Sequence, residues 1–212
     1  RNRAHPDGEI LAGIPIAAGI ALGPLYQFRP PPPTVPAYPA DDPHLELNRL
    51  QEAINTVRKS IQKQRRQVSL TAGEDQAGIF EAHELILIDP DLFEGARTNI
   101  QSGQMNAAAA WQSRINQVAE QYRALDDPYL QGRAADVIDV GNQVLFELAG
   151  EPGNASIEFN HPVILVAEEL TPTQTAQLDL DQVEGVITLL GGPTSHSAIL
   201  ARSLSIPAVT GV

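Results

Sequence analysis

The hydrophobic residues of this 212-residue chain change their spacing once, and the change divides the sequence into two kinds of structure. From residue 45 to residue 148 they recur every three or four positions, which predicts helices with one buried face. After a loop rich in Gly, Pro and Asn at 150–162, short apolar runs alternate with brief helical segments. Strands are expected at 163–167, 184–190 and 206–212, with helices at 172–178 and 195–204 between them. This β-α-β-α-β order predicts an α/β unit with parallel strands.

The helical region divides into segments joined by short loops, so we predict an antiparallel helical bundle. The expected helices cover 45–68 and 76–88, begin again near Asp91, and then start at Asn106 and at Asp127-Pro128. The Asn and Asp-Pro positions are typical start signals, because their side chains accept hydrogen bonds from the first free backbone N–H groups. Ala72 to Asp75 is expected to break the chain between the first two helices.

A proline-rich segment separates the first strands from the first long helix. Residues 10–26 are small and apolar with interspersed Gly and Pro, which predicts one or two short strands, and seven prolines follow within residues 30–43. Proline lacks an N–H group and has a fixed φ, so this segment is predicted to be a stiff connector. We therefore predict a discontinuous α/β domain of residues 10–36 and 151–212, an inserted helical domain at 41–150, and a linker or tail at 1–9.

The charge and composition exclude several classes of protein. With 14 Lys and Arg against 26 Asp and Glu, the net charge of −12 disfavours nucleic-acid binding and favours a basic partner. The chain has no cysteine, which excludes disulfides and thiolate metal sites and fits a cytoplasmic protein; no metal site is expected. No apolar run is long enough to span a membrane, and no signal peptide is recognised. Because the chain begins with Arg1 rather than Met, we interpret it as a piece of a longer protein.

The segment 191–202 combines the residues expected of a phosphoryl-binding turn. Two glycines would let a ligand approach the backbone, and the first turn of a helix would offer unpaired N–H groups. The residues concerned are Gly191, Gly192, Thr194, Ser195, His196 and Ser197. A neutral imidazole can attack phosphorus without prior deprotonation and form a labile bond, so the group could be passed on. The alternative for His196 is an ordinary capping or core-edge histidine.

Charged residues near this segment and on the helices suggest two further features. Residues 151–212 contain seven acidic residues and a single cation, Arg202, which could anchor a phosphate or pair with a nearby carboxylate. The first long helix carries a basic face: Arg58, Lys59, Lys63, Arg65 and Arg66. Between residues 74 and 97 there are seven carboxylates and one cation. This acidic region could attract a basic partner, or it could be a solvated face.

The segment 191–202 resembles the phosphohistidine signature shared by Enzyme I of the phosphoenolpyruvate-dependent phosphotransferase system, phosphoenolpyruvate synthase and pyruvate phosphate dikinase. Further segments resemble the amino-terminal half of Enzyme I: 79–84, 125–130, 133–141 and 170–178. The similarity extends from about Ile10 to Val212 and departs mainly at the proline run. It implies a swivelling phosphohistidine α/β domain, interrupted by an inserted antiparallel helical bundle that docks the small carrier HPr.

The resemblance also assigns roles to individual residues. His196 matches the phosphorylated histidine, with transfer through Nε2, and Thr194 and Ser195 accompany it in the catalytic turn. Thr175 matches a threonine that hydrogen-bonds the imidazole, and Arg133 an arginine near the phosphoryl group at the domain junction. Each has an alternative: Thr175 as an ordinary helix residue, and Arg133 as half of a surface pair with Asp136 or Asp139. Support for the phosphoryl group is expected from Gly191, Gly192, Ser197 and Arg202.

HPr docking is expected on the second helix and its continuation. The matching positions are Asp75, Gly78, His83, Leu85, Ile86, Asp91 and Leu92. HPr is a basic partner, and the acidic region described above would attract it. The alternative for His83 is a histidine that packs between helices.

A complete Enzyme I continues into a barrel that binds phosphoenolpyruvate and Mg²⁺ and mediates dimerisation. The resemblance therefore implies that this chain holds no cofactor itself and exchanges phosphate with HPr without loading itself from phosphoenolpyruvate. The parent could be a truncated Enzyme I serving sugar transport. We favour a fusion such as the multidomain phosphotransferase subunit of dihydroxyacetone kinase, which would add the kinase subunits as partners. Two alternatives remain: a non-catalytic HPr-docking module, and the swivelling domain of a dikinase-like enzyme.

Overall fold

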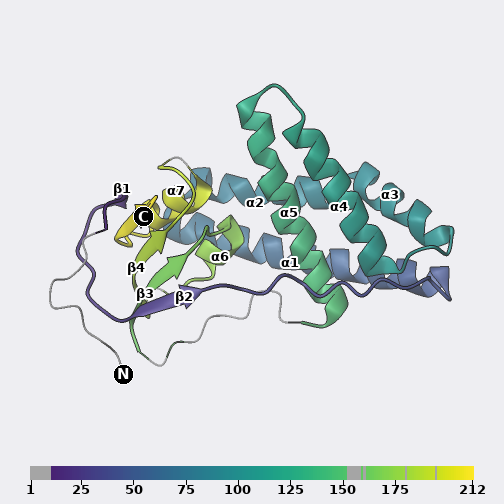
Figure 1. Ribbon diagram of the computed structural model, residues 1–212, viewed down its shortest axis with the longest axis horizontal. Coiled ribbons are helices and arrows are strands. Elements are labelled where there is room, and N and C mark those ends of the chain that lie inside the picture. The colour runs from purple at the N-terminus through teal and green to yellow at the C-terminus, as the bar shows by residue number, and fades with distance from the viewer. Residues whose placement is uncertain (1–10, 152–158, 160, 180, 194) are drawn as a thin grey trace. The chain divides into compact units, whose positions relative to one another are not determined.

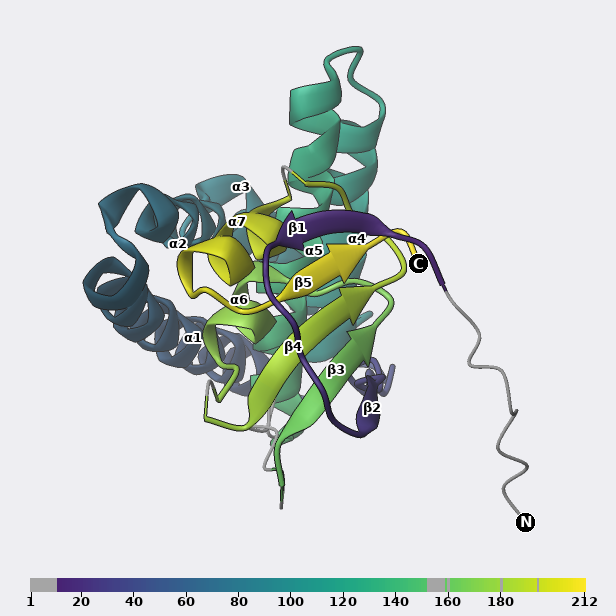
Figure 2. The ribbon, with the colours of Figure 1, turned by 90° about the vertical axis from the view of Figure 1, so that its left-hand side faces the viewer.

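The computed structural model describes residues 11–151, 159, 161–179, 181–193 and 195–212, with the side chains of His196 and Ser197 excepted. The chain divides into two compact units, each described here by itself. The α/β unit contains Arg1–Arg29 and Ser156–Val212, and the helical unit contains Pro30–Ala155. Residues 30–36, which the sequence analysis assigned to the α/β domain, group with the helical unit. Figures 1 and 2 together label the elements of both.

The α/β unit is built on a five-stranded sheet with the order β1-β5-β4-β3-β2. The strands are β1 (Ile14–Ala17), β2 (Leu25–Phe28), β3 (Val163–Ala167), β4 (Val183–Thr188) and β5 (Ala208–Thr210). β2, β3, β4 and β5 pair in parallel, whereas β1 is antiparallel to β5. The helices α6 (Pro172–Ala176) and α7 (His196–Ser203) connect β3 to β4 and β4 to β5. The predicted α/β fold class and its β-α-β-α-β run are confirmed.

The two faces of this sheet are covered differently. Figure 2 shows the segment between β1 and β2 crossing the face opposite to α6 and α7. This segment packs closely because Gly185 of β4 has no side chain: a Cβ there would lie 2.8 Å from the Cβ of Ala21. On the helix-covered side, Ile16 of β1 packs with Ala198 and Ala201 of α7.

The helical unit contains five helices in the described part of the chain. They are α1 (Pro43–Ala72), α2 (Glu74–Leu87), α3 (Pro90–Gln101), α4 (Ala107–Arg123) and α5 (Pro128–Ala149). Asn106 and Asp127 cap the last two as predicted, each accepting hydrogen bonds from backbone N–H groups in the first turn. The core is built from apolar side chains on all five helices, with Trp111, Phe80, Leu50 and Ile100 fully buried.

Several predicted boundaries were wrong by a few residues. The break between the first two helices is a single residue, Gly73 (φ +99°), so α2 begins at Glu74 and not at 76. The strands predicted at 184–190 and 206–212 are shorter, and α7 begins at His196 because Ser195 is its N-cap. The predicted connector ends at Asp42, since Pro43 already occupies the first helical position of α1.

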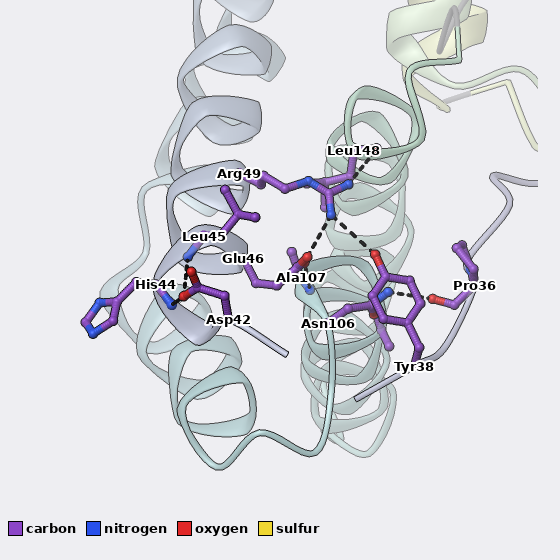
Figure 3. Close-up of polar contacts among 11 residues, drawn as sticks. Pro36, Tyr38, Asp42, His44, Leu45, Glu46, Arg49, Asn106, Ala107 and Leu148 are labelled. Atoms are coloured by element: carbon purple, nitrogen blue, oxygen red, sulfur yellow. Dashed lines mark hydrogen bonds and ion pairs between the residues drawn. The ribbon is translucent and has the colours of Figure 1, made fainter. Parts of the chain in front are cut away.

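The end of the proline-rich segment is bound firmly to the helical unit (Figure 3). Asn106 donates its side-chain N–H to Pro36 O (2.8 Å) and its backbone N–H to Tyr38 O (2.9 Å). The buried carboxylate of Glu46 accepts the backbone N–H of Ala107 (2.8 Å) and pairs with Arg49 (2.8 Å). The two bonds of Asn106 join residues far apart in the sequence, so residues 36–38 pack against the start of α4. Among the described helices, none is both long and apolar enough to cross a bilayer.

Candidate functional site

The segment 189–203 has the strand-turn-helix geometry that the sequence analysis predicted. It leaves the carboxyl end of β4 and turns at Gly191, whose φ of +92° lies in the left-handed region that favours glycine. Ser195 then caps α7 by accepting the backbone N–H of Ala198 (3.3 Å), and His196 is the first residue of the helix. Thr194 and the side chains of His196 and Ser197 lie outside the described residues. The predicted nucleophile is therefore the first residue of a helix that follows a glycine turn, a location typical of anion-binding sites.

A hydroxyl on the neighbouring strand anchors this turn. The Oγ1 of Thr210 accepts a hydrogen bond from Oγ1 of Thr188 (2.8 Å). It donates toward the carbonyl oxygens of Leu190 (2.9 Å) and Gly191 (3.2 Å). Both threonines are buried. The turn is thus tied to the ends of β4 and β5, a function that the sequence analysis did not assign to either threonine.

Arg202 anchors the other side of the turn. Its Nε donates to the carbonyl oxygen of Ile16 in β1 (3.1 Å), and its Nη2 donates to the carbonyl oxygen of Pro193 (3.3 Å). Its described contacts are to backbone carbonyls and not to the carboxylate that was the predicted alternative. Support of a phosphoryl group by Arg202 stays a prediction, and its observed contacts position the loop that precedes His196.

Beside the turn lies a small cavity of about 20 Å³. This is about the space of one water molecule. Thr175, Thr188, Ser195 and Thr210 contribute polar groups to a lining that is otherwise mostly apolar. Thr175 is buried, and its hydroxyl donates to Thr171 O within its own helix (2.9 Å). The predicted bond from Thr175 to the imidazole stays a prediction.

The predicted docking positions on α2 and α3 separate into exposed and buried sets. Asp75, Gly78, Leu85 and Asp91 are exposed, and Ile86 is half-buried. His83 and Leu92 are buried in the core of the helical unit, so their prediction as surface contacts was wrong. The Nε2 of His83 lies 3.6 Å from Oδ1 of Asp136, and its Nδ1 lies 4.0 Å from Oδ2 of Asp139. His83 therefore packs between helices, as the alternative prediction stated.

The acidic region is less negative than the sequence suggested, because α1 lies alongside α2. Arg58 of α1 pairs with Glu84 (2.7 Å), and Arg65 pairs with Glu81 (3.1 Å). The carboxylate of Glu84 also accepts a hydrogen bond from Gln62 (2.7 Å). The bonds from Arg58 and Gln62 lower the pKa of Glu84 below its ordinary value. Two carboxylates of the acidic region are therefore neutralised within the unit by the basic face of α1.

These bonds predict a pH dependence of stability. Because the pKa of Glu84 is lower in the folded state, its contribution is fully present above about pH 4.5, the ordinary range of a glutamate, and is lost as the pH falls through the lowered folded value. Arg58→Gln should reduce the free energy of unfolding at neutral pH by about 0.2–1 kcal/mol, since Arg58 is half exposed. The measurement is urea unfolding from pH 7 downward, with the pair Arg97–Glu94, whose carboxylate is exposed, as control (Arg97→Gln). A difference between wild type and Arg58→Gln that persists at the lowest pH would contradict this account.

Arg133 lies on α5 and pairs with Asp136, three residues further along the helix. Its Nη1 is 3.0 Å from Oδ2 of Asp136, and its Nη2 donates a hydrogen bond to the hydroxyl of Tyr129. Partial burial alone would lower the pKa of Arg133, but the bonds to Tyr129 and Asp136 raise it above its ordinary value. The predicted alternative of a pair with Asp136 is therefore present, although the carboxylate is buried and not on the surface.

Comparison with known proteins assigns the family. Residues 12–133 match the family described as PEP-utilising enzyme, N-terminal. Residues 159–212, which include the turn before His196, match the PEP-utilising enzyme mobile domain. This chain belongs to the PEP-utilising enzymes.

Relatives and solved structures of this family agree with that assignment. The phosphoenolpyruvate-protein phosphotransferase of Bacillus subtilis is 40% identical over 202 residues, covering 95% of this chain and 35% of that protein. The corresponding protein of Enterococcus faecalis is 37% identical over 204 residues, covering 96% of this chain and 36% of the relative. The chain thus spans about a third of the length of these curated relatives.

Two solved structures share the fold. A solution structure of Enzyme I (nEIt) has a TM-score of 0.76 at 33% identity, covering 95% of this chain and 82% of that one. The N-terminal domain of Enzyme 1 - Nitrogen has a TM-score of 0.68 at 32% identity, covering 94% and 82%. The resemblance to the amino-terminal half of Enzyme I is confirmed. A parent that serves dihydroxyacetone kinase stays a prediction.

Proposed function

We propose that this member of the PEP-utilising enzymes is a phosphoryl-transfer domain that exchanges phosphate with HPr through His196. The observation that carries the proposal is the turn at 191–195, held by Thr210 and Arg202 and leading directly into a helix whose first residue is His196. Gly191 supplies a left-handed turn before α7, and the first N–H groups of a helix suit the oxygens of a phosphoryl group. The relatives' name, phosphoenolpyruvate-protein phosphotransferase, supports the same chemistry.

The proposed step is an in-line transfer between two histidines. The neutral Nε2 of His196 attacks the phosphorus of phospho-HPr, a new N–P bond forms, and the N–P bond to the HPr imidazole breaks. The electron pair of the broken bond returns to that imidazole. The reaction is reversible because both sides contain one phosphoimidazole and one free imidazole. Catalysis here would consist of positioning and of stabilising the charge on the phosphoryl oxygens.

For the partner, we propose docking on the exposed residues of α2 and of the start of α3. Asp75, Gly78, Leu85 and Asp91 are exposed there, with Ile86 half-buried. Exposed apolar side chains together with the carboxylates of Asp75 and Asp91 suit a basic protein, because charge steers the encounter and the apolar contact holds the complex. His83 and Leu92 support this surface from beneath.

The experiment is phosphate exchange with radiolabelled phospho-HPr. The wild type should become labelled, and the label should be lost in acid and kept in alkali, as expected for phosphohistidine. His196→Ala should remain unlabelled. His161→Ala is the matched control, since His161 is exposed and lies just before β3 in the same unit; it should label like the wild type. Label on His196→Ala would refute the proposal, and HPr binding without label on the wild type would indicate a docking module.

A further inference from the structure

The guanidinium of Arg133 is held from two sides by residues of its own helix. Tyr129 and Asp136 lie four residues before and three residues after it, so all three share one face of α5. The Tyr129 hydroxyl accepts a hydrogen bond from Nη2, and the Cζ of Arg133 lies 4.9 Å from the centroid of the tyrosine ring. On the other side, Oδ2 of Asp136 accepts from Nη1 (3.0 Å). A long side chain that is usually mobile is thereby fixed at its charged end.

The carboxylate of Asp136 also lies close to a second helix. Its other oxygen, Oδ1, lies 3.6 Å from Nε2 of His83 on α2, and the His83 side chain is fully buried. Phe80 packs against the same imidazole, with ring centroids 5.9 Å apart. Because Asp136 is bounded by α2 on one side and Arg133 on the other, it cannot rotate freely to follow a moving guanidinium.

This arrangement differs from the ordinary ion pairs of the same unit. Arg97–Glu94 and Arg123–Glu120 have the same three-residue spacing, but both members of each pair are exposed. Such pairs contribute little and do not hold a side chain in one geometry. In the pair of Arg133 the carboxylate side chain is only 7% exposed, and the arginine side chain is 24% exposed. The Arg133 side chain is therefore held by a buried carboxylate and is itself still partly exposed to solvent.

The Arg133 guanidinium retains donors for an anion. A guanidinium has five N–H groups, and the bonds to Tyr129 and Asp136 use one on Nη2 and one on Nη1. The remaining donors suit the oxygens of a phosphoryl group, which arginine binds with a planar, bidentate geometry. Fixing the side chain before the phosphoryl group arrives would save the entropy of ordering it during transfer.

We propose that Tyr129 and Asp136 are positioning residues for phosphoryl transfer, holding the Arg133 guanidinium toward the phosphoryl group of a docked HPr. This inference rests on the proposed function and on the location near the phosphoryl group that the resemblance to Enzyme I implies for Arg133. Neither residue touches the reacting atoms; each acts through Arg133. If the two residues had a purely structural role, each would contribute to folding, and the effect of substituting it would be the same with and without Arg133.

The test is a double-mutant cycle on the rate of transfer from phospho-HPr. Tyr129→Phe keeps the ring and removes the hydroxyl, and Asp136→Asn keeps the shape and removes the charge. Each should slow the maximal rate about tenfold without changing the HPr concentration that gives half the maximal rate, because the proposed docking residues on α2 and α3 are unchanged. Arg133→Ala should slow it more. In the Arg133→Ala background, Tyr129→Phe and Asp136→Asn should have no further effect, since the group they position is gone.

The matched control is Glu120→Gln, which breaks an exposed pair of the same spacing outside the acidic region and should leave the rate unchanged. Circular dichroism checks the fold of every variant, and Tyr129→Phe, at an exposed position, keeps the test valid if Asp136→Asn does not fold. Equal slowing by Tyr129→Phe in the presence and absence of Arg133, or transfer at the wild-type rate, would overturn the inference. An unlabelled wild type would instead overturn the proposed function.

Discussion

Trp111→Ala is expected to lower the free energy of unfolding of the helical unit by about 3–5 kcal/mol, as is typical of a large aromatic residue removed from a core. Trp111 is fully buried on α4, and its indole N–H donates to Gly141 O on α5 (3.1 Å). The two helices are in close contact there, because a Cβ on Gly141 would lie 2.7 Å from Ile115. Such tight packing leaves little room for neighbours to fill the cavity. The loss is a large part of the 5–15 kcal/mol of a typical domain.

The measurement is denaturant unfolding followed by far-ultraviolet circular dichroism, since the chain has a single tryptophan and the substitution removes its fluorescence. Trp111→Phe should cost less, because it keeps most of the ring and loses the bond to Gly141. Leu130→Ala, at a partly exposed position of α5, should stay within about 1 kcal/mol of the wild type. If Trp111→Ala were as stable as Leu130→Ala, the described packing of α4 on α5 would be wrong.

Thr210→Val should reduce phosphorylation of His196 by about 10- to 100-fold, because it releases the turn that precedes the histidine. The substitution preserves shape but removes the hydroxyl that binds Leu190 O and Gly191 O and accepts from Thr188. The buried hydroxyl of Thr188 then loses its partner, which should cost about 1–3 kcal/mol of stability. The initial rate of labelling and the free energy of unfolding should therefore both fall.

A second substitution separates the two effects. Thr188→Val leaves the bonds from Thr210 to the two carbonyls in place, so the labelling rate should stay near that of the wild type. In the double variant no hydroxyl is left unpaired between the strands, and part of the stability should return. Labelling should remain slow, because the turn is still released. A double variant that labelled at the wild-type rate would show that Thr210 contributes only to stability.

The order and type of the elements could be predicted because local patterns determine them. The three-to-four spacing of apolar residues indicated α1, and the Asn106 and Asp127-Pro128 signals marked the starts of α4 and α5. The switch to short apolar runs after residue 162 indicated the parallel strands. Each of these signals depends on residues within a few positions of one another. The predicted ends of the helices and strands were less accurate, as at Gly73, because competing contacts determine where an element ends.

The candidate site was predictable only in part. The glycines and hydroxyl residues around His196 are contiguous, so their pattern indicated the turn. The role of Thr210 was missed, because the residue that it anchors is nearly twenty positions away and a threonine in a strand is otherwise unremarkable. The same holds for the two partners of Arg133. Their spacing was visible in the sequence, but the burial of Asp136 and the hydrogen bond to the exposed Tyr129 were not.

The sequence by itself thus determined the helices and strands, the α/β class and the location of the glycine turn before His196, because spacing, capping and turn chemistry are local. Only the tertiary structure decided that His83 and Leu92 are buried and that Arg58 and Arg65 neutralise part of the acidic helix. On α2 apolar and polar residues are mixed, so the buried side depends on which neighbours cover it, here α1 and α5. Burial and ion pairing between helices depend on residues distant in the chain, and a local pattern carries no information about them.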